Sequence, residues 1–435
     1  MQHSIERMGE EEKERKVLTE LAGKLSMTQT KEDQRKIISY VINQVYPDLS
    51  PREKNSLIDK FLRFGQFEDL MEDSDIEDIL INSINSVFVF HAKKGMIKTN
   101  KTFKDVEDLN IFAEKLLVVS GKTEFKPVNN FHLPDGSRVN IVSSPTGPQI
   151  TIRKFKHRTL SIIDLIKSGT LDYFLAAQLW VYSEGLGIKP ANLLIGGMPG
   201  SGKTTLLNAL FSFFPTNERT VVIEDTLELN TKSKENCSRL ECNPELSMRD
   251  LVKNTLRMRP DRIIVGEVRG EEAMDLMTAM NIGKICMGTL HASTSREAVM
   301  RLQNEPMNIP QESVPLIDVF VIIRHFLLPS GVFRTVSQVS EVGGIEKKVL
   351  LSDLCIFDPK SGKMAESHPS VIYRDKLAEA AGITPKEIMD EINLRSKILK
   401  TLEKNNITTI EAISEFCAKY YENPNKALTS IGLPM

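Results

Sequence analysis

The stretch GGMPGSGKTT, residues 196–205, decides the fold that this sequence predicts. It matches the pattern G-x-x-x-x-G-K-[ST] in full, through Gly197, Gly202, Lys203 and Thr204. The apolar run ANLLIGG comes before it, and the run TTLLNALFSFF follows. A strand, a glycine-rich turn and a helix in that order direct backbone N–H groups at a phosphate. The stretch therefore predicts a nucleotide-binding loop in an α/β fold, and it leaves open what the nucleotide is used for.

The side chains of this loop have separate expected tasks. Lys203 would neutralise charge on the β and γ phosphates, and the Thr204 hydroxyl would ligate Mg²⁺. The glycines would let the backbone approach the phosphates closely. The loop therefore indicates ATP or GTP with Mg²⁺, contacted by Gly197, Pro199, Gly200, Ser201, Gly202, Lys203, Thr204 and Thr205.

Length and composition are those of a globular protein. The 435 residues favour two or three domains. Hydrophobic residues at 41% and charged residues at 26% exclude a disordered or fibrous class. A formal net charge of −2 means that a nucleic acid would need a local basic patch. The five cysteines form no C-x-x-C pair, so neither a disulfide framework nor a four-cysteine zinc site follows from their spacing. We expect reduced thiols in a cytosolic protein.

No segment is expected to cross a membrane. The start, MQHSIERMGEEEKERK, lacks an apolar core of signal-peptide length. The longest apolar run, residues 314–329, is interrupted by Asp318, Arg324 and His325 and is too short to span a bilayer. Attachment to a membrane protein remains open.

The sequence pattern changes along the chain and predicts four parts. Residues 1–64 form a helical extension, because leucines recur at helical spacing and SPRE at 50–53 has the form of a capping box. Residues 65–158 alternate apolar and polar side chains, which indicates a mixed α/β domain with an antiparallel sheet. Residues 159–350 hold the apolar strands of a parallel α/β core with helices on both faces. Residues 351–435 are mostly helical, and 383–405 is their clearest amphipathic run.

Acidic residues and a histidine follow the apolar strands of the third part. Glu267 ends DRIIVGE, and Glu224, Asp225 and Glu228 follow RTVVI. Carboxylates there can hold Mg²⁺, or orient or deprotonate an attacking water, although a purely structural capping role remains open. His291 in GTLHAST also follows an apolar strand, where a parallel sheet presents its ligand. Position alone does not separate a functional from a structural histidine.

Arginines can meet the charge spread over a transferring phosphoryl group. Arg138 and Arg153 lie in the second part of the chain. Four more flank the Glu267 strand: Arg257, Arg259, Arg262 and Arg269. Six arginines cannot all contact one nucleotide, and their spacing does not choose among them.

Four motifs stand in a fixed order: GGMPGSGKTT, VVIEDTLEL, RMRPDRIIVGEVRG and MGTLHAST. The series resembles the Walker A, Asp box, Walker B and His box of the type II/type IV secretion ATPase superfamily, which powers type IV pili, the archaellum, and type II and type IV secretion. Segments before the loop (FEDLMEDSDIEDILIN, FHLPDGSRVNI, TIRKF) resemble the family's N-terminal domain. FRTVSQVSEVGG and ILKTLEKNNI resemble the tight-adherence and archaeal branch. The resemblance covers residues 65–425.

The resemblance implies a RecA-like ATPase core in a hexameric ring, with ATP and Mg²⁺ between that core and the N-terminal domain. It implies that Glu224 is the base, that Glu267 holds Mg²⁺ or positions the water, and that His291 senses the γ-phosphate. Arg138 and Arg153 match the family's arginines that reach the phosphates. The implied partner is an integral membrane platform protein, which would hold the chain at the inner face of the membrane without direct contact to nucleic acid.

The sequence also departs from the family pattern. Ile282-Gly283-Lys284 stands where many relatives have Thr-Gly-His, so a second histidine of the His box is missing. The four-cysteine zinc element and the AIRNLI-like signature of retraction motors are absent from the sequence. These differences favour the tight-adherence, archaeal pilus and archaellum branch.

Two alternatives to a filament or secretion motor remain. A nucleic-acid translocase would use the basic stretch TIRKFKHR, residues 151–158, with its one aromatic side chain. A P-loop kinase acting on a small molecule would need only the loop and its carboxylates. The sequence does not identify the cargo.

Overall fold

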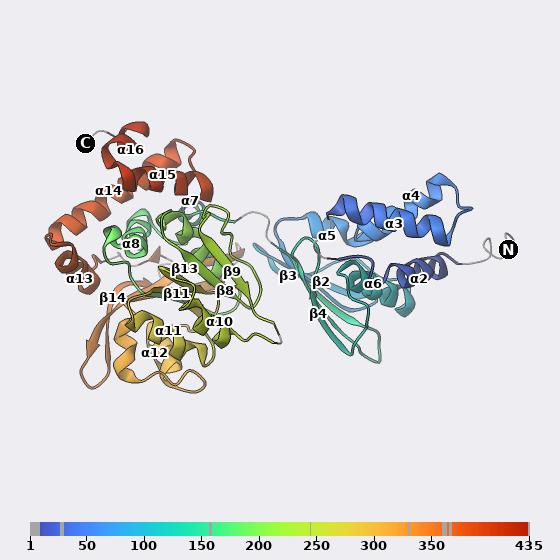
Figure 1. Cartoon of the computed structure of the whole chain (residues 1–435), viewed down its shortest axis with the longest axis horizontal. Helices are drawn as coiled ribbons and strands as arrows, with labels where there is room; N and C mark the ends of the chain where they lie inside the picture. The colour runs from blue at the N-terminus through green and yellow to red at the C-terminus, as the bar shows by residue number, and fades with distance from the viewer. Residues whose placement is uncertain are drawn as a thin grey trace. The chain divides into compact units, whose positions relative to one another are not determined.

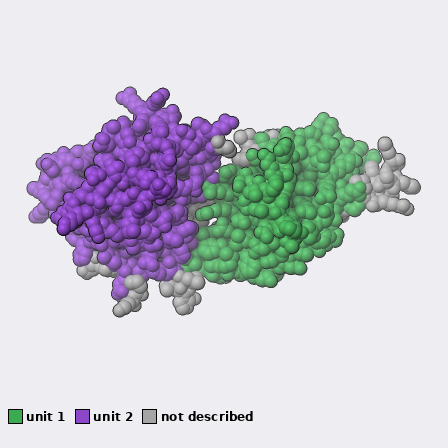
Figure 2. Space-filling view, turned by 90° about the horizontal axis from the view of Figure 1, so that it is seen from below, with its two compact units in different colours: residues 1–157, 327–332 green, residues 158–326, 333–435 purple. Residues whose placement is uncertain are grey.

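The computed structural model describes residues 9–26, 30–155, 159–243, 245–328, 331–358, 363–364 and 368–433. The chain divides into two compact units, each of which is described by itself. Unit 1 comprises Met1–His157 and Leu327–Val332, and unit 2 comprises Arg158–Phe326 and Phe333–Met435 (Figure 2). The finer division into four parts stays a prediction.

Unit 1 begins with three helices, α2 (Glu10–Leu21), α3 (Lys31–Val45) and α4 (Pro51–Leu62). The capping box expected before α4 is present. Ser50 Oγ accepts from the Glu53 backbone N–H at 3.3 Å, and the Glu53 carboxylate accepts from the Ser50 N–H at 2.9 Å. Two N–H groups at the start of α4 are thereby satisfied, which fixes where the helix begins.

The N-terminal helices pack against α6 (Val106–Val119). Leu21 and Ile42 share one hydrophobic cluster with Ile111 of α6. Arg15 of α2 pairs with Glu107 of α6 at 2.7 Å, so an ion pair also links these two helices. Helices α2, α3 and α4 therefore pack with α6 as part of unit 1 (Figure 1).

A six-stranded sheet forms the rest of unit 1, in the order β3-β2-β1-β6-β5-β4. All neighbouring strands are antiparallel, as the sequence predicted. The short helices η1 (Gly65–Phe67) and α5 (Glu68–Glu72) come before it. The strands are β1 (Ile76–Ser83), β2 (Ser86–His91), β3 (Gly95–Lys98), β4 (Val128–His132), β5 (Arg138–Val142) and β6 (Gln149–Arg153).

Unit 2 is built on a nine-stranded sheet in the order β15-β14-β13-β12-β7-β11-β10-β8-β9. From β12 to β9 all neighbours are parallel, whereas β13, β14 and β15 extend the sheet with antiparallel pairs. The strands are β7 (Leu193–Gly196), β8 (Thr220–Glu224), β9 (Cys237–Glu241), β10 (Arg262–Val265), β11 (Ile285–Leu290), β12 (Val319–Leu328), β13 (Gly331–Ile345), β14 (Val349–Asp358) and β15 (Lys363–Met364).

Helices cover both faces of this sheet, which confirms the predicted fold class. Leu193 and Ile195 pack into one hydrophobic cluster with α8 and α9, and Leu194 packs into another with α11 and α12. Alternate residues of a strand buried on opposite faces require a layer on each side. The helices are α7 (Ile162–Lys167), α8 (Tyr173–Glu184), η2 (Gly185–Gly187), α9 (Lys203–Leu210), η3 (Phe211–Phe213), α10 (Met248–Thr255), α11 (Glu272–Asn281), α12 (Ser295–Gln303) and η4 (Gln311–Leu316).

The C-terminal helices are part of the core of unit 2. They are α13 (Ile372–Ala381), α14 (Pro385–Lys404), α15 (Ile410–Glu422) and α16 (Pro424–Ser430). The buried Arg395 of α14 pairs with Glu184 of α8 at 2.6 Å, and its guanidinium lies 4.8 Å from the centre of the Trp180 ring. Trp180 in turn stacks on Phe213, with 4.9 Å between the ring centres. A buried charge is tolerated only when it is paired, so this contact fixes α14 on α8.

Among the described residues, no helix is both long enough and apolar enough to span a bilayer. The apolar run noted at residues 314–329 contributes most of its described length to β12, which lies inside the sheet beside β7.

Candidate functional site

The predicted site residues of unit 2 lie at one edge of the parallel sheet. Strands β7, β11, β10 and β8 are consecutive neighbours, and their registers align Gly196 with Leu290 and Val265 with Ile223. Gly197, His291, Glu267 and Glu224 each stand at or just beyond the carboxyl end of one of these strands. Ligands of open α/β sheets bind at that edge. The topology therefore brings together four groups that are up to 94 positions apart in the chain.

The loop between β7 and α9 has the shape of a phosphate cradle. A Cβ added to Gly197 would lie 2.3 Å from Ser201 Oγ and 2.6 Å from the Ile323 carbonyl oxygen, so a side chain there would clash. Gly200 and Gly202 have φ values of 71° and 103°, in the region that favours glycine. Ser201 Oγ is buried and has no hydrogen-bond partner among the described residues. These features fit a bound phosphate.

Lys203 starts α9 and points back into this loop. It is 8% exposed, and its Nζ donates to the carbonyl oxygens of Gly197 at 2.8 Å and Met198 at 3.3 Å. The same Nζ lies 3.4 Å from Nδ1 of His291. The ammonium therefore sits inside the cradle, where an incoming phosphate can replace carbonyl oxygens as its partner. Of the other predicted contacts, Thr204 and Thr205 are partly buried in the first turn of α9 and Pro199 is exposed.

Glu224 ends β8 with its carboxylate buried at 3% exposure. Oε1 accepts from the backbone N–H groups of Glu228 at 2.9 Å and Leu229 at 3.0 Å. Oε2 has no hydrogen-bond partner among the described residues, and the nearest cation, Arg239, is 3.7 Å away. Burial raises the pKa of Glu224 to about 7, although the two N–H donors and Arg239 act in the opposite direction. A carboxylate with this pKa can exchange a proton near neutral pH.

Glu267 and His291 form a pair beside the loop. Glu267 Oε1 lies 3.0 Å from His291 Nε2, and both side chains are about 30% exposed. Because the other ring nitrogen of His291 faces Lys203, the three residues form a continuous polar chain from the phosphate loop to the end of β10. Asp225, also considered from the sequence, pairs instead with Arg269 at 2.5 Å.

Arg138 and Arg153 are directly opposite each other in the antiparallel pair β5 and β6. Their neighbours Val139 and Ile152 are buried in the core of unit 1, so the two arginines project from the other face of the sheet. Like charges directly opposite each other in a sheet repel each other. Their contact with phosphate stays a prediction.

The remaining arginines divide into buried and exposed groups. Arg262 is fully buried, donates to the Ser183 carbonyl oxygen at 2.8 Å and pairs with Glu218 at 2.9 Å, so it serves the fold. Arg257 and Arg259 are exposed.

Sequence reasoning missed two arginines near the site. Arg239 on β9 faces Glu224, and Arg334 on β13 donates through Nε to the Gly200 carbonyl oxygen at 2.9 Å. Neither strand was predicted, so no local pattern indicated which arginines would lie beside the loop.

Thr204 and Glu267 are the predicted Mg²⁺ ligands. Among the described residues, no group of three or more His, Cys, Asp or Glu side chains is arranged to hold a metal ion. In phosphate-loop enzymes Mg²⁺ is usually held by one or two protein groups together with the substrate phosphates and water, so Thr204 and Glu267 as ligands stay a prediction.

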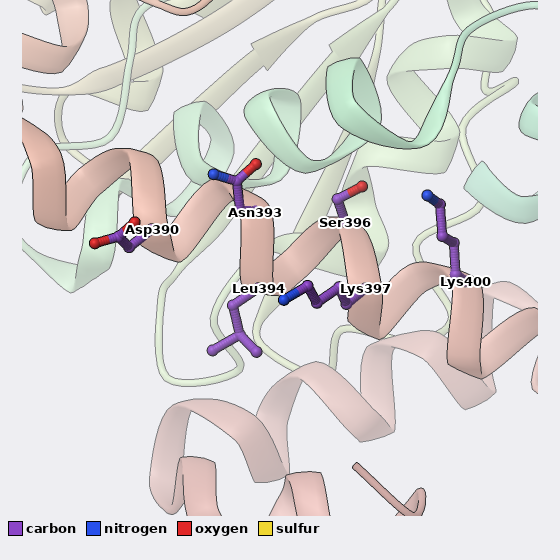
Figure 3. A pocket seen from close by; sticks show the side chains of 6 residues that line it. All are labelled: Asp390, Asn393, Leu394, Ser396, Lys397 and Lys400. Atoms are coloured by element: carbon purple, nitrogen blue, oxygen red, sulfur yellow. The ribbon is translucent and has the colours of Figure 1, made fainter. Parts of the chain in front are cut away.

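A surface hollow elsewhere in unit 2 contains none of these residues. It lies along the exposed side of α14 and is lined by Asp390, Asn393, Leu394, Ser396, Lys397 and Lys400 (Figure 3). The opposite side of α14 faces the core.

If Glu224 acts as a general base, kcat/KM for ATP hydrolysis will depend on pH with a midpoint near 7. Below that value the carboxyl is protonated and cannot accept a proton, so kcat/KM is expected to fall about tenfold per pH unit. Measurement of kcat/KM from pH 5.5 to 8.5, together with ATP binding over the same range, checks this. A flat profile of kcat/KM, or a fall explained wholly by loss of binding, would contradict it.

The chain was also compared with known families, curated proteins and solved structures. Residues 124–326 match the model of the family described as "Type II/IV secretion system protein". An uncharacterized protein of Methanocaldococcus jannaschii is 45% identical over 235 residues, which are 51% of this chain and 32% of that protein. This chain therefore matches about a third of that relative's length.

A second uncharacterized protein of M. jannaschii is 30% identical over 427 residues, covering 92% of this chain and 75% of that protein. The crystal structure of the VirB11 ATPase from the Brucella suis type IV secretion system is 25% identical, with a TM-score of 0.33, and covers 63% of this chain and 93% of that chain. The chain described here belongs to the type II/IV secretion system protein family.

Proposed function

We propose that this chain is a Mg²⁺-dependent ATPase that acts as a motor. The observation that carries the proposal is the meeting of the loop at residues 197–204, Glu224 and the Glu267–His291 pair at the ends of four neighbouring parallel strands. A phosphate cradle, a buried carboxylate and a second carboxylate at one edge are the parts that ATP hydrolysis requires. Membership of the type II/IV secretion system protein family supports the same function.

The roles proposed for the residues follow from their positions. Lys203 and the backbone of the loop bind the phosphates, and Thr204 and Glu267 would hold Mg²⁺, which would neutralise phosphate charge. Glu224 accepts the proton of the attacking water through Oε2, which has no hydrogen-bond partner among the described residues. His291 senses the γ-phosphate, and it contacts both Lys203 and Glu267. Arg138 and Arg153 supply positive charge to the phosphates.

We further propose that six copies form a ring and that hydrolysis powers assembly of a type IV pilus-like or archaellum-like filament, or secretion. The ring would act on an integral membrane platform protein at the cytoplasmic face of the membrane. The family description, which names type II and type IV secretion systems, supports this class of task. The relation to the archaeal branch is supported only by the M. jannaschii relatives.

A nucleic-acid translocase is the second candidate. Its support is the basic stretch at residues 151–158, of which Lys156–Arg158 lie outside the described residues. The net charge of −2 gives the whole chain no attraction for nucleic acid.

Assays of phosphate release distinguish these functions. We expect release from ATP without an added acceptor, and turnover per subunit that rises with protein concentration until the ring is assembled. Single- or double-stranded DNA is expected to change turnover little at any salt concentration. Strong, salt-sensitive stimulation by DNA would favour the translocase. Turnover per subunit that is unchanged on dilution would contradict a ring with shared sites, and a requirement for a small-molecule acceptor would indicate a kinase.

A further inference from the structure

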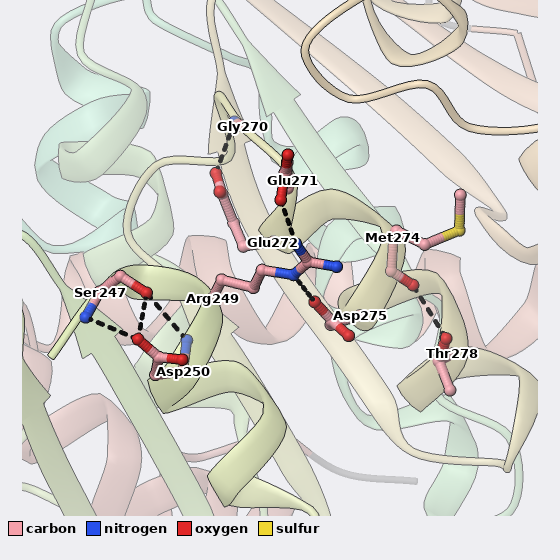
Figure 4. A network of polar contacts seen from close by, with 9 residues as sticks. All are labelled: Ser247, Arg249, Asp250, Gly270, Glu271, Glu272, Met274, Asp275 and Thr278. Atoms are coloured by element: carbon pink, nitrogen blue, oxygen red, sulfur yellow. Dashed lines mark hydrogen bonds and ion pairs between the residues drawn. The ribbon is translucent and has the colours of Figure 1, made fainter.

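Glu272 is a buried carboxylate for which the proposed mechanism has no role. It is the first residue of α11 and is 5% exposed. Its Oε1 accepts two backbone hydrogen bonds, from the N–H groups of Arg269 and Gly270, each at 2.7 Å (Figure 4 shows the contact to Gly270). A carboxylate that accepts two N–H groups at this distance holds the peptide units that carry them. These peptides belong to the loop that follows β10 and carries Glu267.

Gly270 lies very close to the Glu272 carboxylate. A Cβ added to Gly270 would lie 2.8 Å from Glu272 Oε2, a distance that requires the carboxylate or the loop to move. The sequence Gly270-Glu271-Glu272 therefore lets the loop pass close to a carboxylate two positions ahead. This close approach is specific to the backbone conformation of the loop.

The other end of the same loop is held by β11. Thr289 Oγ1 donates to the Gly266 carbonyl oxygen at 2.6 Å, and the Val268 N–H donates to the Thr289 carbonyl oxygen at 2.7 Å. Glu267 therefore lies between Gly266 and Val268, which are both hydrogen-bonded to Thr289 of β11. The next two residues, Arg269 and Gly270, are hydrogen-bonded to Glu272. His291 directly follows β11, so its distance to Glu267 depends on how this loop is held.

The helix that carries Glu272 is itself fixed. Arg249 of α10 reaches across to α11, where its Nε lies 3.0 Å from Asp275 and its Nη1 contacts Glu271 (Figure 4). α10 also packs against α11 through hydrophobic residues of the same core cluster. Because α11 is held in place, the Glu272 carboxylate can hold the loop that follows β10 in one position.

We propose that Glu272 is a positioning residue that sets the geometry of the Glu267–His291 pair through its two backbone hydrogen bonds. It touches neither nucleotide nor Mg²⁺ in this proposal. Its effect is on the chemical step, because a carboxylate that moves by about 1 Å can lose about 10²-fold in rate while binding is retained. The inference rests on the proposed ATPase function and assigns a further residue to that site.

The test compares Glu272→Ala with Glu272→Gln in the full chain. The glutamine carbonyl oxygen can accept the same two N–H bonds, whereas alanine removes the acceptor. We expect kcat to fall at least about tenfold in Glu272→Ala and less than about threefold in Glu272→Gln, with KM and nucleotide affinity changed by less than about threefold in both. Glu379→Ala, which removes an exposed carboxylate on α13 in the same unit, is the control and should retain wild-type kcat.

A readout independent of turnover is the ¹⁵N signal of the His291 imidazole. The chain has seven histidines, and the His291 signal is identified by its loss in His291→Gln. We expect this signal to shift in Glu272→Ala and to stay in place in Glu272→Gln. If Glu272→Ala does not fold, Glu272→Asp, which shortens the side chain by one methylene, replaces it in the comparison.

Unchanged kcat and an unchanged His291 signal in Glu272→Ala would overturn the proposal, as would equal loss of kcat in the alanine and glutamine variants. Failure of the proposed function looks different. If the wild-type chain releases no phosphate from ATP, or if Lys203→Ala does so normally, the ATPase assignment fails. The His291 signal then still tests the geometry by itself.

Discussion

Replacement of Lys203 by alanine is expected to remove ATP turnover. The ammonium of Lys203 is 8% exposed and is held inside the cradle by the carbonyl oxygens of Gly197 and Met198. A positive charge in that position acts on the phosphates in a site largely shielded from water, and loss of one such contact typically costs roughly 10²–10³-fold in kcat. Since Lys203 also contributes to binding the phosphates, nucleotide affinity is expected to fall as well.

The measurement is phosphate release at saturating ATP, with nucleotide binding followed separately. Lys253→Ala is a suitable control, because Lys253 is an exposed lysine near the end of α10 in the same unit. It should leave turnover and binding unchanged. Normal hydrolysis in Lys203→Ala would remove the basis for the proposed function.

Replacement of Glu224 by glutamine is expected to block hydrolysis while ATP still binds. The glutamine carbonyl oxygen can accept the N–H groups of Glu228 and Leu229, so the loop after β8 keeps its shape. The amide cannot accept the proton of the attacking water, and loss of a general base costs about 10²–10⁴-fold in rate. Single-turnover phosphate release and binding of ATP measure the two effects separately.

Glu224→Gln is also expected to change the unfolding temperature of the protein in a pH-dependent way. The folded-state pKa of Glu224 is raised to about 7 from a usual value of 4.5, so the ionised carboxylate opposes folding above pH 4.5 and does so fully above pH 7. Glu224→Gln should therefore unfold at a higher temperature than the wild type at pH 8, and this difference in unfolding temperature should narrow as the pH falls from 7 towards 4.5.

Glu267→Gln is the variant with which the hydrolysis rate of Glu224→Gln is compared. If it alone blocked hydrolysis with binding intact, the roles of the two carboxylates would be reversed.

The parts of the site carried by short continuous motifs could be predicted from the sequence. An apolar strand, a glycine-rich turn and a helix identify the loop, and carboxyl ends of parallel strands necessarily meet at one edge. Glu224, Glu267 and His291 were therefore placed near Lys203 without knowledge of strand order. The capping box before α4 is similarly local, since Ser50 and Glu53 are three positions apart in the sequence and hydrogen-bond to each other.

Contacts between distant segments could not be predicted in this way. Arg239 and Arg334 reach the site from β9 and β13, and the antiparallel extension that contains β13 has no motif that indicates its partner strand. Arg395 and Glu184 are 211 positions apart (395 − 184), and neither residue type nor spacing connects them. Such pairs are set by how helices pack, which depends on the whole fold.

Trp180 is the only tryptophan of the chain, and its ring is fully buried between Phe213 and Arg395. Phe213 belongs to the 3₁₀ turn that directly follows the helix of the phosphate loop, and Arg395 belongs to a C-terminal helix. Fluorescence emission from the unlabelled protein therefore arises from a single position. Trp180 lies where the segment that follows the phosphate-loop helix packs against the C-terminal helices. A change in the packing between them should therefore change the fluorescence emission of Trp180.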